Sequence, residues 1–293
     1  MKIGFLGLGI MGAPMAGHLI AGGHEVSTAI HRSPAPEALL AKSLKVLPSP
    51  KAVAENAEIV IIMVSDTPDV EDVLFRDDGV AAGLTPGKTV IDMSSISPLA
   101  TKSFAHRIAE LECDYLDAPV SGGDVGARDG TLTIMVGGPE AAVSRAMPLF
   151  ELMGKTVTHI GGNGDGQTAK VANQIIVAVT VQAVSEALVF ASKAGADVHA
   201  VREALMGGFA GSRILEIHGE RMIERAFDPG FRIGLHQKDL NIALAGAREM
   251  GVALPGAACA QQLLSGCVAR GGADWDTSAM IRALEALADH AIG

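Results

Sequence analysis

The chain has 293 residues, of which 48% are apolar and 19% charged, enough to bury one large core or two ordinary ones. Its formal net charge of −10 argues against nucleic acid or an anionic membrane as the main partner. Three cysteines without a C-x-x-C pair argue against a disulfide framework and a structural zinc site, and we predict no metal.

The N-terminus, MKIGFLGLG, has the pattern of a strand followed by a glycine loop. It lacks the apolar region and cleavage site of a signal peptide. We find no run of about 18 uncharged, apolar residues that would predict a membrane span. We therefore expect a cytoplasmic protein.

Short apolar runs alternate with amphipathic segments up to about residue 160. Strands are predicted at 2–7, 25–30, 58–64, 88–93, 114–119, 131–136 and 156–160. The run IVIIMV at 59–64 is apolar on both faces, as expected of a parallel strand that is covered on both sides. The alternation predicts a Rossmann-type, doubly wound α/β domain over residues 1–162.

The pattern then changes to helices alone. Residues 167–193 contain no Gly or Pro, and a helix of that length would extend roughly 40 Å. Further helices are predicted near 197–206, 212–225, 235–250, 255–269 and 277–289. We therefore expect an all-helical domain over residues 163–293, joined to the first domain by the long helix.

The first strand leads into a G-x-G-x-x-G loop, followed by a helix, which is the context a dinucleotide site requires. The cofactor-binding residues predicted here are Gly7, Leu8, Gly9, Ile10, Met11 and Gly12. Gly7 would make the tight turn, Gly9 would let the pyrophosphate approach, and Gly12 would let the helix pack closely. The unpaired N–H groups of the helix N-terminus favour phosphate.

The residues after the second strand bear on the choice of cofactor. NAD-preferring sites usually have an acidic residue there for the ribose 2′-hydroxyl, whereas this chain has His31 and Arg32. Arg32 can pair with a 2′-phosphate, so the sequence favours NADP(H) over NAD(H). A solvated surface arginine is the alternative interpretation.

Two polar loops follow later strands of the predicted sheet. Val64 and Ser65 lie in one and Ser95 in the other, and we predict that they line the nicotinamide half of the cofactor. Turn and helix-cap chemistry would favour the same residue types. A third loop contains Ser121, Gly122 and Gly123, whose hydroxyl and N–H groups suit a substrate carboxylate. A structural Ser-Gly-Gly turn is the alternative interpretation.

Polar residues open the otherwise apolar long helix. Lys170, Asn173 and Gln174 have the spacing of one helical face. If this face borders the cofactor crevice, the helix N-terminus and apolar walls lower the pKa of Lys170 and suit it to general acid–base catalysis. Asn173 would hold the reacting oxygen or orient the lysine, and Lys238 would add a second cation for a substrate carboxylate or the cofactor. A solvated lysine in the first turns is the alternative.

Four stretches together resemble the β-hydroxyacid dehydrogenase family. They are GFLGLGIMGAPMA at 4–16, DAPVSGG at 117–123, GDGQTAKVANQ at 164–174 and KDL at 238–240. The resemblance implies that Lys170 is the catalytic lysine and that Ser121–Gly123, Asn173 and Gln174 bind substrate. It also implies that Ser95 lies next to the cofactor and Lys238 at its nicotinamide end.

The resemblance implies reversible, NAD(P)H-dependent reduction of a semialdehyde acid. Stretches such as IDMSSISP at 91–98 favour tartronate semialdehyde, with glycerate as product. The alternatives are another β-hydroxyacid such as 3-hydroxyisobutyrate or 4-hydroxybutyrate, and a nicotinamide-binding protein without turnover. We also predict a homo-oligomer, because a long helix that is apolar all round exceeds what a small helical domain covers.

Overall fold

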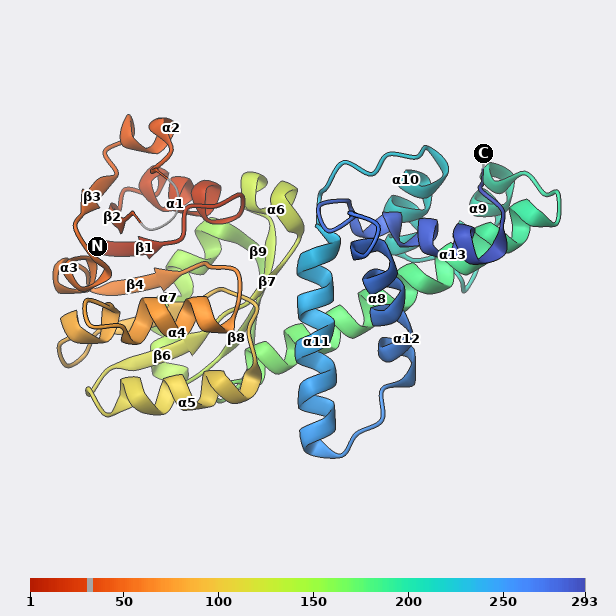
Figure 1. Cartoon of the computed structure of the whole chain (residues 1–293). Coiled ribbons are helices and arrows are strands. Elements are labelled where there is room, and N and C mark those ends of the chain that lie inside the picture. Colours follow the sequence, from red (N-terminus) through yellow and green to blue (C-terminus); the bar gives the residue numbers. More distant parts are fainter. Residues whose placement is uncertain (31–33, 293) are drawn as a thin grey trace. The chain divides into compact units, whose positions relative to one another are not determined.

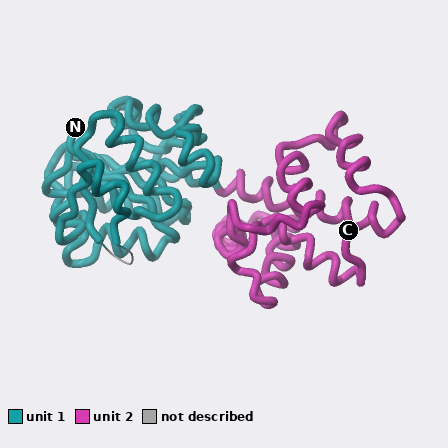
Figure 2. The backbone as a smooth tube through the Cα atoms, turned by 90° about the horizontal axis from the view of Figure 1, so that it is seen from above, with its two compact units in different colours: residues 1–170 teal, residues 171–293 magenta. Residues whose placement is uncertain are grey.

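The computed structural model describes residues 1–30 and 34–292 of the chain. These residues form two compact units, Met1–Lys170 (unit 1) and Val171–Gly293 (unit 2) (Figure 2). The division falls inside the long helix α8 (Asp165–Lys193), eight residues after the predicted boundary at 162/163. The first turn of α8 packs with unit 1.

Unit 1 is built around a nine-stranded sheet whose order is β3-β2-β1-β4-β5-β6-β8-β7, with β9 paired to β8. The strands from β3 to β6 are parallel, and β8 runs antiparallel to β6 and β7. This confirms the predicted Rossmann-type topology. The strands are β1 (Lys2–Leu6), β2 (Glu25–Ala29), β3 (Lys45–Leu47), β4 (Ile59–Ile62), β5 (Thr89–Asp92), β6 (Asp114–Asp117), β7 (Val120–Ser121), β8 (Leu132–Gly137) and β9 (Gly154–Gly161).

Two of these strands were not predicted. β3 has three residues at the edge of the sheet, and its Val46 is 45% exposed. β7 has only two residues. Strands this short contain too few residues for an alternating pattern, so their sequences give no strand signal.

Helices cover both faces of the sheet (Figure 1). Ile59 and Ile61 of β4 pack in one apolar cluster, and Val60 and Ile62 pack in another. This confirms that β4 is buried on both sides. The first cluster includes residues of α1 (Gly12–Ala21), α2 (Glu37–Leu40), α6 (Gly123–Asp129) and α7 (Glu140–Met153), and the second includes residues of α3 (Pro50–Asn56), α4 (Thr67–Phe75), the 3₁₀ turn η1 (Val80–Gly83) and α5 (Pro98–Ala109).

The described residues of unit 2 form helices joined by loops and contain no strand, and one isolated bridge pairs Arg232 with Asp276. This confirms the predicted all-helical second half. After α8 come α9 (Val198–Met206), a π-helical turn η2 (Leu215–Gly219), α10 (Glu220–Ile223), α11 (Ile233–Met250), α12 (Pro255–Val268), a 3₁₀ turn η3 (Thr277–Met280) and α13 (Ile281–Ala288).

Helix α8 is long and apolar enough, by length and composition, to cross a membrane, although Lys170 and Glu186 limit its longest uncharged run to residues 171–185. Its best 18-residue window has a mean hydropathy of 1.9, and 39% of that window is buried. The fully buried residues Ala178, Val181 and Leu188 belong to the apolar core of unit 2. A core helix has this composition because its side chains pack on several neighbours.

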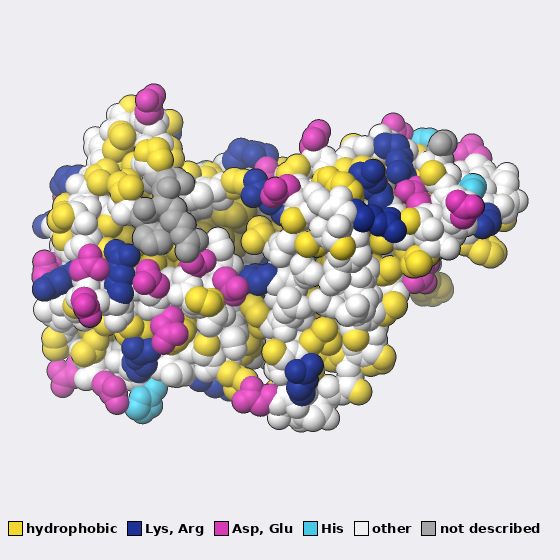
Figure 3. Space-filling view, in the orientation of Figure 1, with side chains coloured by type: hydrophobic (Ala, Val, Ile, Leu, Met, Phe, Trp, Pro, Cys, Tyr) yellow, Lys and Arg dark blue, Asp and Glu magenta, His cyan; other side chains and the backbone are white. Residues whose placement is uncertain are grey.

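The surface of each unit is mixed. On the face shown in Figure 3, basic, acidic and hydrophobic side chains all occur on both units. Scattered apolar atoms of this kind are normal for a folded surface. The three cysteines are unpaired, with Cys113 and Cys267 buried and Cys259 exposed.

Candidate active site

The glycine loop after β1 has the geometry that a dinucleotide site needs. Gly7 has a φ of 101°, and a Cβ there would lie 2.1 Å from the carbonyl oxygen of Met63. A Cβ on Gly12 would lie 1.9 Å from the carbonyl oxygen of Gly7, so α1 packs closely on the loop. A Cβ on Gly9 would meet nothing within 4 Å. Space for a ligand therefore lies beside Gly9, while the other two glycines shape the loop.

The remaining loop residues divide between core and surface. Leu8 and Met11 pack against the apolar cluster that contains Ile59 and Ile61, whereas Ile10 is 64% exposed. The predicted residues His31 and Arg32 lie outside the described residues.

The structure places the other two predicted cofactor loops at the same edge of the sheet. Strands β1, β4 and β5 are neighbours and parallel, so the loops after them meet at their carboxyl ends. The N–H of Val64 donates a hydrogen bond to Oγ of Ser94, with N and O 3.0 Å apart. Ser65 and Ser95 therefore lie on two loops that this bond joins.

Asp92, which the sequence analysis did not single out, supports that junction. Its fully buried carboxylate accepts hydrogen bonds from the N–H of Ser94 at 2.9 Å and from the Tyr115 hydroxyl at 3.1 Å. Burial raises the pKa of Asp92 to about 7, although the hydrogen bonds from Ser94 and Tyr115 favour the charged form. The signal in the sequence was an acidic residue at the end of an otherwise apolar strand.

We expect Asp92→Asn to remove part of the dependence of stability on pH. The pKa of Asp92 is raised on folding, so its contribution to stability is present below about pH 3.9 and is lost as pH rises through about 7. Asparagine cannot ionise, so the variant should gain stability relative to the wild type between pH 5 and 8, by at most a few kcal/mol. Urea unfolding at both pH values measures this, and equal pH slopes for the two proteins would contradict it.

The predicted carboxylate loop starts after β6 and includes β7. Gly122 and Gly123 have φ values of 130° and 63°, which glycine adopts without strain. Ser121 is half-buried, and Gly122 is exposed. The loop therefore presents a hydroxyl and backbone N–H groups near the surface, as a carboxylate site requires.

Lys170 lies in the second turn of α8 and is only 9% exposed. It is the last residue of unit 1. Asn173 follows it by three residues in the same continuous helix, so the two share a face of α8. The alternative of a solvated lysine does not fit this burial.

A chain of polar contacts in unit 2 includes the other predicted residues. The Asn173 amide donates to Oε1 of Gln174 at 2.7 Å, and the Gln174 amide donates to Oδ2 of Asp239 at 2.6 Å. Nζ of Lys238 lies 2.9 Å from Oδ1 of Asp239. Asp239 therefore connects α8 to Lys238 on α11.

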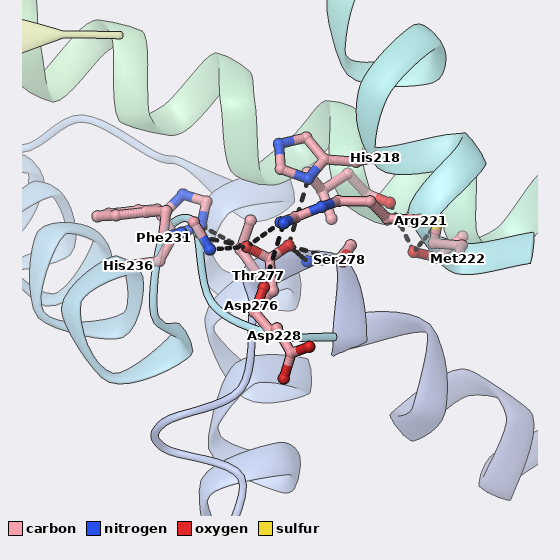
Figure 4. Close-up of polar contacts among 12 residues, drawn as sticks. His218, Arg221, Met222, Asp228, Phe231, His236, Asp276, Thr277 and Ser278 are labelled. Atoms are coloured by element: carbon pink, nitrogen blue, oxygen red, sulfur yellow. Dashed lines mark hydrogen bonds and ion pairs between the residues drawn. The ribbon is translucent and has the colours of Figure 1, made fainter. Parts of the chain in front are cut away.

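A second polar cluster fixes the start of α11 (Figure 4). The fully buried carboxylate of Asp276 lies 2.6 Å from Nη1 of Arg221 and 3.5 Å from Nδ1 of His218, and it accepts hydrogen bonds from Ser278 and from the N–H of Phe231. Burial would raise the pKa of Asp276, but these donors outweigh it and hold that pKa well below its usual range. The ionised carboxylate thus anchors the loop before α11.

His236 connects this cluster to α8. It is fully buried, and its Nδ1 lies 2.7 Å from Oγ1 of Thr277. Its Nε2 lies 3.4 Å from the carbonyl oxygen of Gln174. These contacts place His236 between Thr277 and the backbone of α8.

A doubly wound sheet with such a glycine loop, and a buried lysine on a long helix, defines a nicotinamide-dependent oxidoreductase. The protein-family model for the NAD binding domain of 6-phosphogluconate dehydrogenase matches residues 2–161. The family model for the NAD-binding region of NADP-dependent 3-hydroxyisobutyrate dehydrogenase matches residues 164–284. The chain belongs to the β-hydroxyacid dehydrogenase family of NAD(P)-dependent oxidoreductases.

Individual relatives agree with this assignment. The chain is 57% identical to 2-hydroxy-3-oxopropionate reductase of Escherichia coli, over 99% of both chains. It is 42% identical to a probable mitochondrial 3-hydroxyisobutyrate dehydrogenase-like protein of Arabidopsis thaliana, over 98% of this chain and 86% of that protein. The solved 3-hydroxyisobutyrate dehydrogenase of Mycobacterium tuberculosis with L-serine is 33% identical, with a TM-score of 0.88 over 97% and 98% of the two chains.

Proposed function

We propose that this chain catalyses the reversible NAD(P)H-dependent reduction of tartronate semialdehyde (2-hydroxy-3-oxopropionate) to glycerate. The observation that carries the proposal is the 57% identity over nearly the whole chain to the E. coli reductase of that substrate. The buried position of Lys170 on α8 supports a role in proton transfer.

The glycine loop fits a dinucleotide, because the space beside Gly9 is open and the N-terminus of α1 follows. Residues 7–12 would hold the pyrophosphate, and the loops with Val64, Ser65 and Ser95 would border the nicotinamide. When bound, the reduced coenzyme supplies the hydride that the aldehyde carbon receives.

The chain's own residues would bind the substrate and supply the proton. Ser121 and the N–H groups of Gly122 and Gly123 hold the carboxylate, which fixes the aldehyde for reaction. The aldehyde oxygen gains negative charge as its carbon is reduced, and Lys170 stabilises this charge and donates the proton that completes the hydroxyl. Asn173, one turn along α8, hydrogen-bonds the same oxygen.

A substrate panel tests the proposal. Tartronate semialdehyde, methylmalonate semialdehyde and succinic semialdehyde are each assayed with NADH and NADPH by following nicotinamide absorbance. The highest kcat/KM for tartronate semialdehyde is expected. A higher value for another semialdehyde would assign the chain to that β-hydroxyacid, and binding without turnover of any would make it a nicotinamide-binding protein.

We propose NADP(H) as the preferred coenzyme, on the basis of Arg32 after the second strand. Arg32→Asp removes the partner of the 2′-phosphate and adds a carboxylate that can bind the 2′-hydroxyl. A charged hydrogen bond contributes about 1.5–3 kcal/mol, so KM for NADPH should rise roughly 10- to 150-fold while KM for NADH falls. An unchanged ratio of the two KM values would show that Arg32 does not select the coenzyme.

We further propose a homo-oligomer that uses an apolar groove between α8 and α13. Phe190 and Leu287, which line the groove, are each 77% exposed. Glu186 and Lys193 border it, each about one turn of α8 from Phe190. Two antiparallel copies of α8 that cross at Phe190 would bring Glu186 of each copy opposite Lys193 of the other, so a second copy is the partner that fits.

Light scattering of the purified chain tests this association. Glu186→Lys should weaken the oligomer because it places two lysines opposite each other. Adding Lys193→Glu to that variant should restore it. A monomeric wild-type chain would contradict the proposal.

We also propose a cytoplasmic location, which the three unpaired cysteines support.

A further inference from the structure

The first turn of α8 is capped by a side chain that lies 47 residues away along the chain. Asp117, the last residue of β6, is fully buried. Its Oδ1 accepts a hydrogen bond from the N–H of Gly164 at 2.8 Å, and its Oδ2 accepts one from the N–H of Gln167 at 2.9 Å. Two N–H groups of the helix end that have no partner within the helix are thereby satisfied, by a group whose negative charge suits that end.

Gln167 makes a second connection between α8 and unit 1. Its side chain is fully buried, and its Nε2 donates to the carbonyl oxygen of Ser94 at 2.7 Å. Its Oε1 accepts from the N–H of Ile96 at 3.1 Å. The carbonyl of Ser94 can only accept and the N–H of Ile96 can only donate, so these two backbone groups fix the orientation of the Gln167 amide. Gln167 therefore hydrogen-bonds the backbone on both sides of Ser95, at Ser94 and at Ile96.

This connection extends to the neighbouring loop. Ser94, whose carbonyl oxygen binds Gln167, also accepts the hydrogen bond from the N–H of Val64. A single buried side chain on α8 is thus linked to the loops that follow β4 and β5. These are the loops predicted to border the nicotinamide.

The helix has little freedom to move against the sheet. A Cβ on Gly166 would lie 2.5 Å from the carbonyl oxygen of Met135 and 2.6 Å from that of Asp117. Only glycine permits this approach. Lys170 follows Gln167 by three residues and shares its helical face, so a displacement of Gln167 would displace Lys170.

We propose that Gln167 is a positioning residue, which holds Lys170 in register with the cofactor loops at 64–65 and 94–96. The inference rests on the proposed function, in which Lys170 donates the proton. Displacement of a catalytic group by about 1 Å can lower a rate about 100-fold. The amide of Gln167 makes two side-chain hydrogen bonds from α8 to the 94–96 loop.

The test compares Gln167→Met with the control variant Gln182→Met, which makes the same change on the same helix. The side chain of Gln182 is half-buried and has its hydrogen-bond partners in unit 2. For folded Gln167→Met, kcat should fall about 10- to 100-fold while KM for the dinucleotide stays within about threefold. Gln182→Met should keep the wild-type kcat. A kcat within about threefold of wild type in folded Gln167→Met would overturn the proposal.

Two further measurements keep the proposal testable. If Gln167→Met does not fold, Asp117→Asn is the second variant. The asparagine amide places an N–H donor against the N–H of Gly164 or Gln167, which loosens the first turn of α8. An unchanged kcat in Asp117→Asn would overturn the proposal. Limited acetylation of Lys170, followed by mass spectrometry, needs no substrate. Faster labelling in Gln167→Met than in wild type supports the positioning role even if no semialdehyde is turned over, and equal rates contradict it.

Discussion

Lys170→Ala is expected to lower kcat for semialdehyde reduction by about 10²- to 10⁴-fold, the usual contribution of a positioned general acid. Dinucleotide affinity should change little, because the glycine loop that would hold the pyrophosphate lies at residues 7–12. The alkoxide that forms as the aldehyde is reduced would then lack its proton donor and the ammonium group that stabilises its charge. Turnover and dinucleotide affinity are measured separately, by absorbance at saturating substrate and by titration without substrate.

Two control variants make this result specific. Lys155→Ala removes an exposed lysine of β9 in the same unit and should leave kcat unchanged. Lys170→Arg keeps the positive charge but holds its proton too tightly to donate it at neutral pH, so it should recover little of the rate. Near-normal turnover in Lys170→Ala would remove this lysine from the chemistry.

Gly9→Val is expected to fold and to lose most of its dinucleotide affinity. A Cβ at Gly9 meets no protein atom within 4 Å, so the folded protein has room for the side chain. The same space is where the pyrophosphate would approach the backbone. Overpacking costs about 1–3 kcal/mol, so affinity should fall roughly 5- to 150-fold or more.

The matched control for that variant is Gly246→Val on α11, where a Cβ also meets nothing within 4 Å. This variant should bind the dinucleotide like the wild type. Thermal unfolding shows whether either variant is destabilised. Wild-type affinity in folded Gly9→Val would place the dinucleotide elsewhere.

The parts of the fold that could be predicted are those that short stretches of sequence encode. The run Ile59–Ile62 is apolar at consecutive positions, and such a strand is stable only when both faces are covered. The spacing of Gly7, Gly9 and Gly12 specifies a turn whose geometry depends on few neighbours. The long helix followed from the absence of Gly and Pro between residues 167 and 193.

The parts that could not be predicted depend on contacts between distant segments. Asp92 and Asp117 are paired residues of neighbouring strands, but the order of the strands was needed to show this. Gln167 resembled any polar residue of a first helical turn until its partners at Ser94 and Ile96 were known. Asp239 could not be linked to Gln174, because 65 residues separate them.

The sequence by itself therefore determined the type of fold, the glycine loop and the lysine on the long helix. These features depend on the spacing of apolar residues and glycines within short stretches of the chain, which the sequence shows directly. Only the tertiary structure decided which buried side chains hold that lysine and the cofactor loops in place. A buried polar group must find a hydrogen-bond partner, and the partner's identity depends on which segments folding brings within about 3 Å.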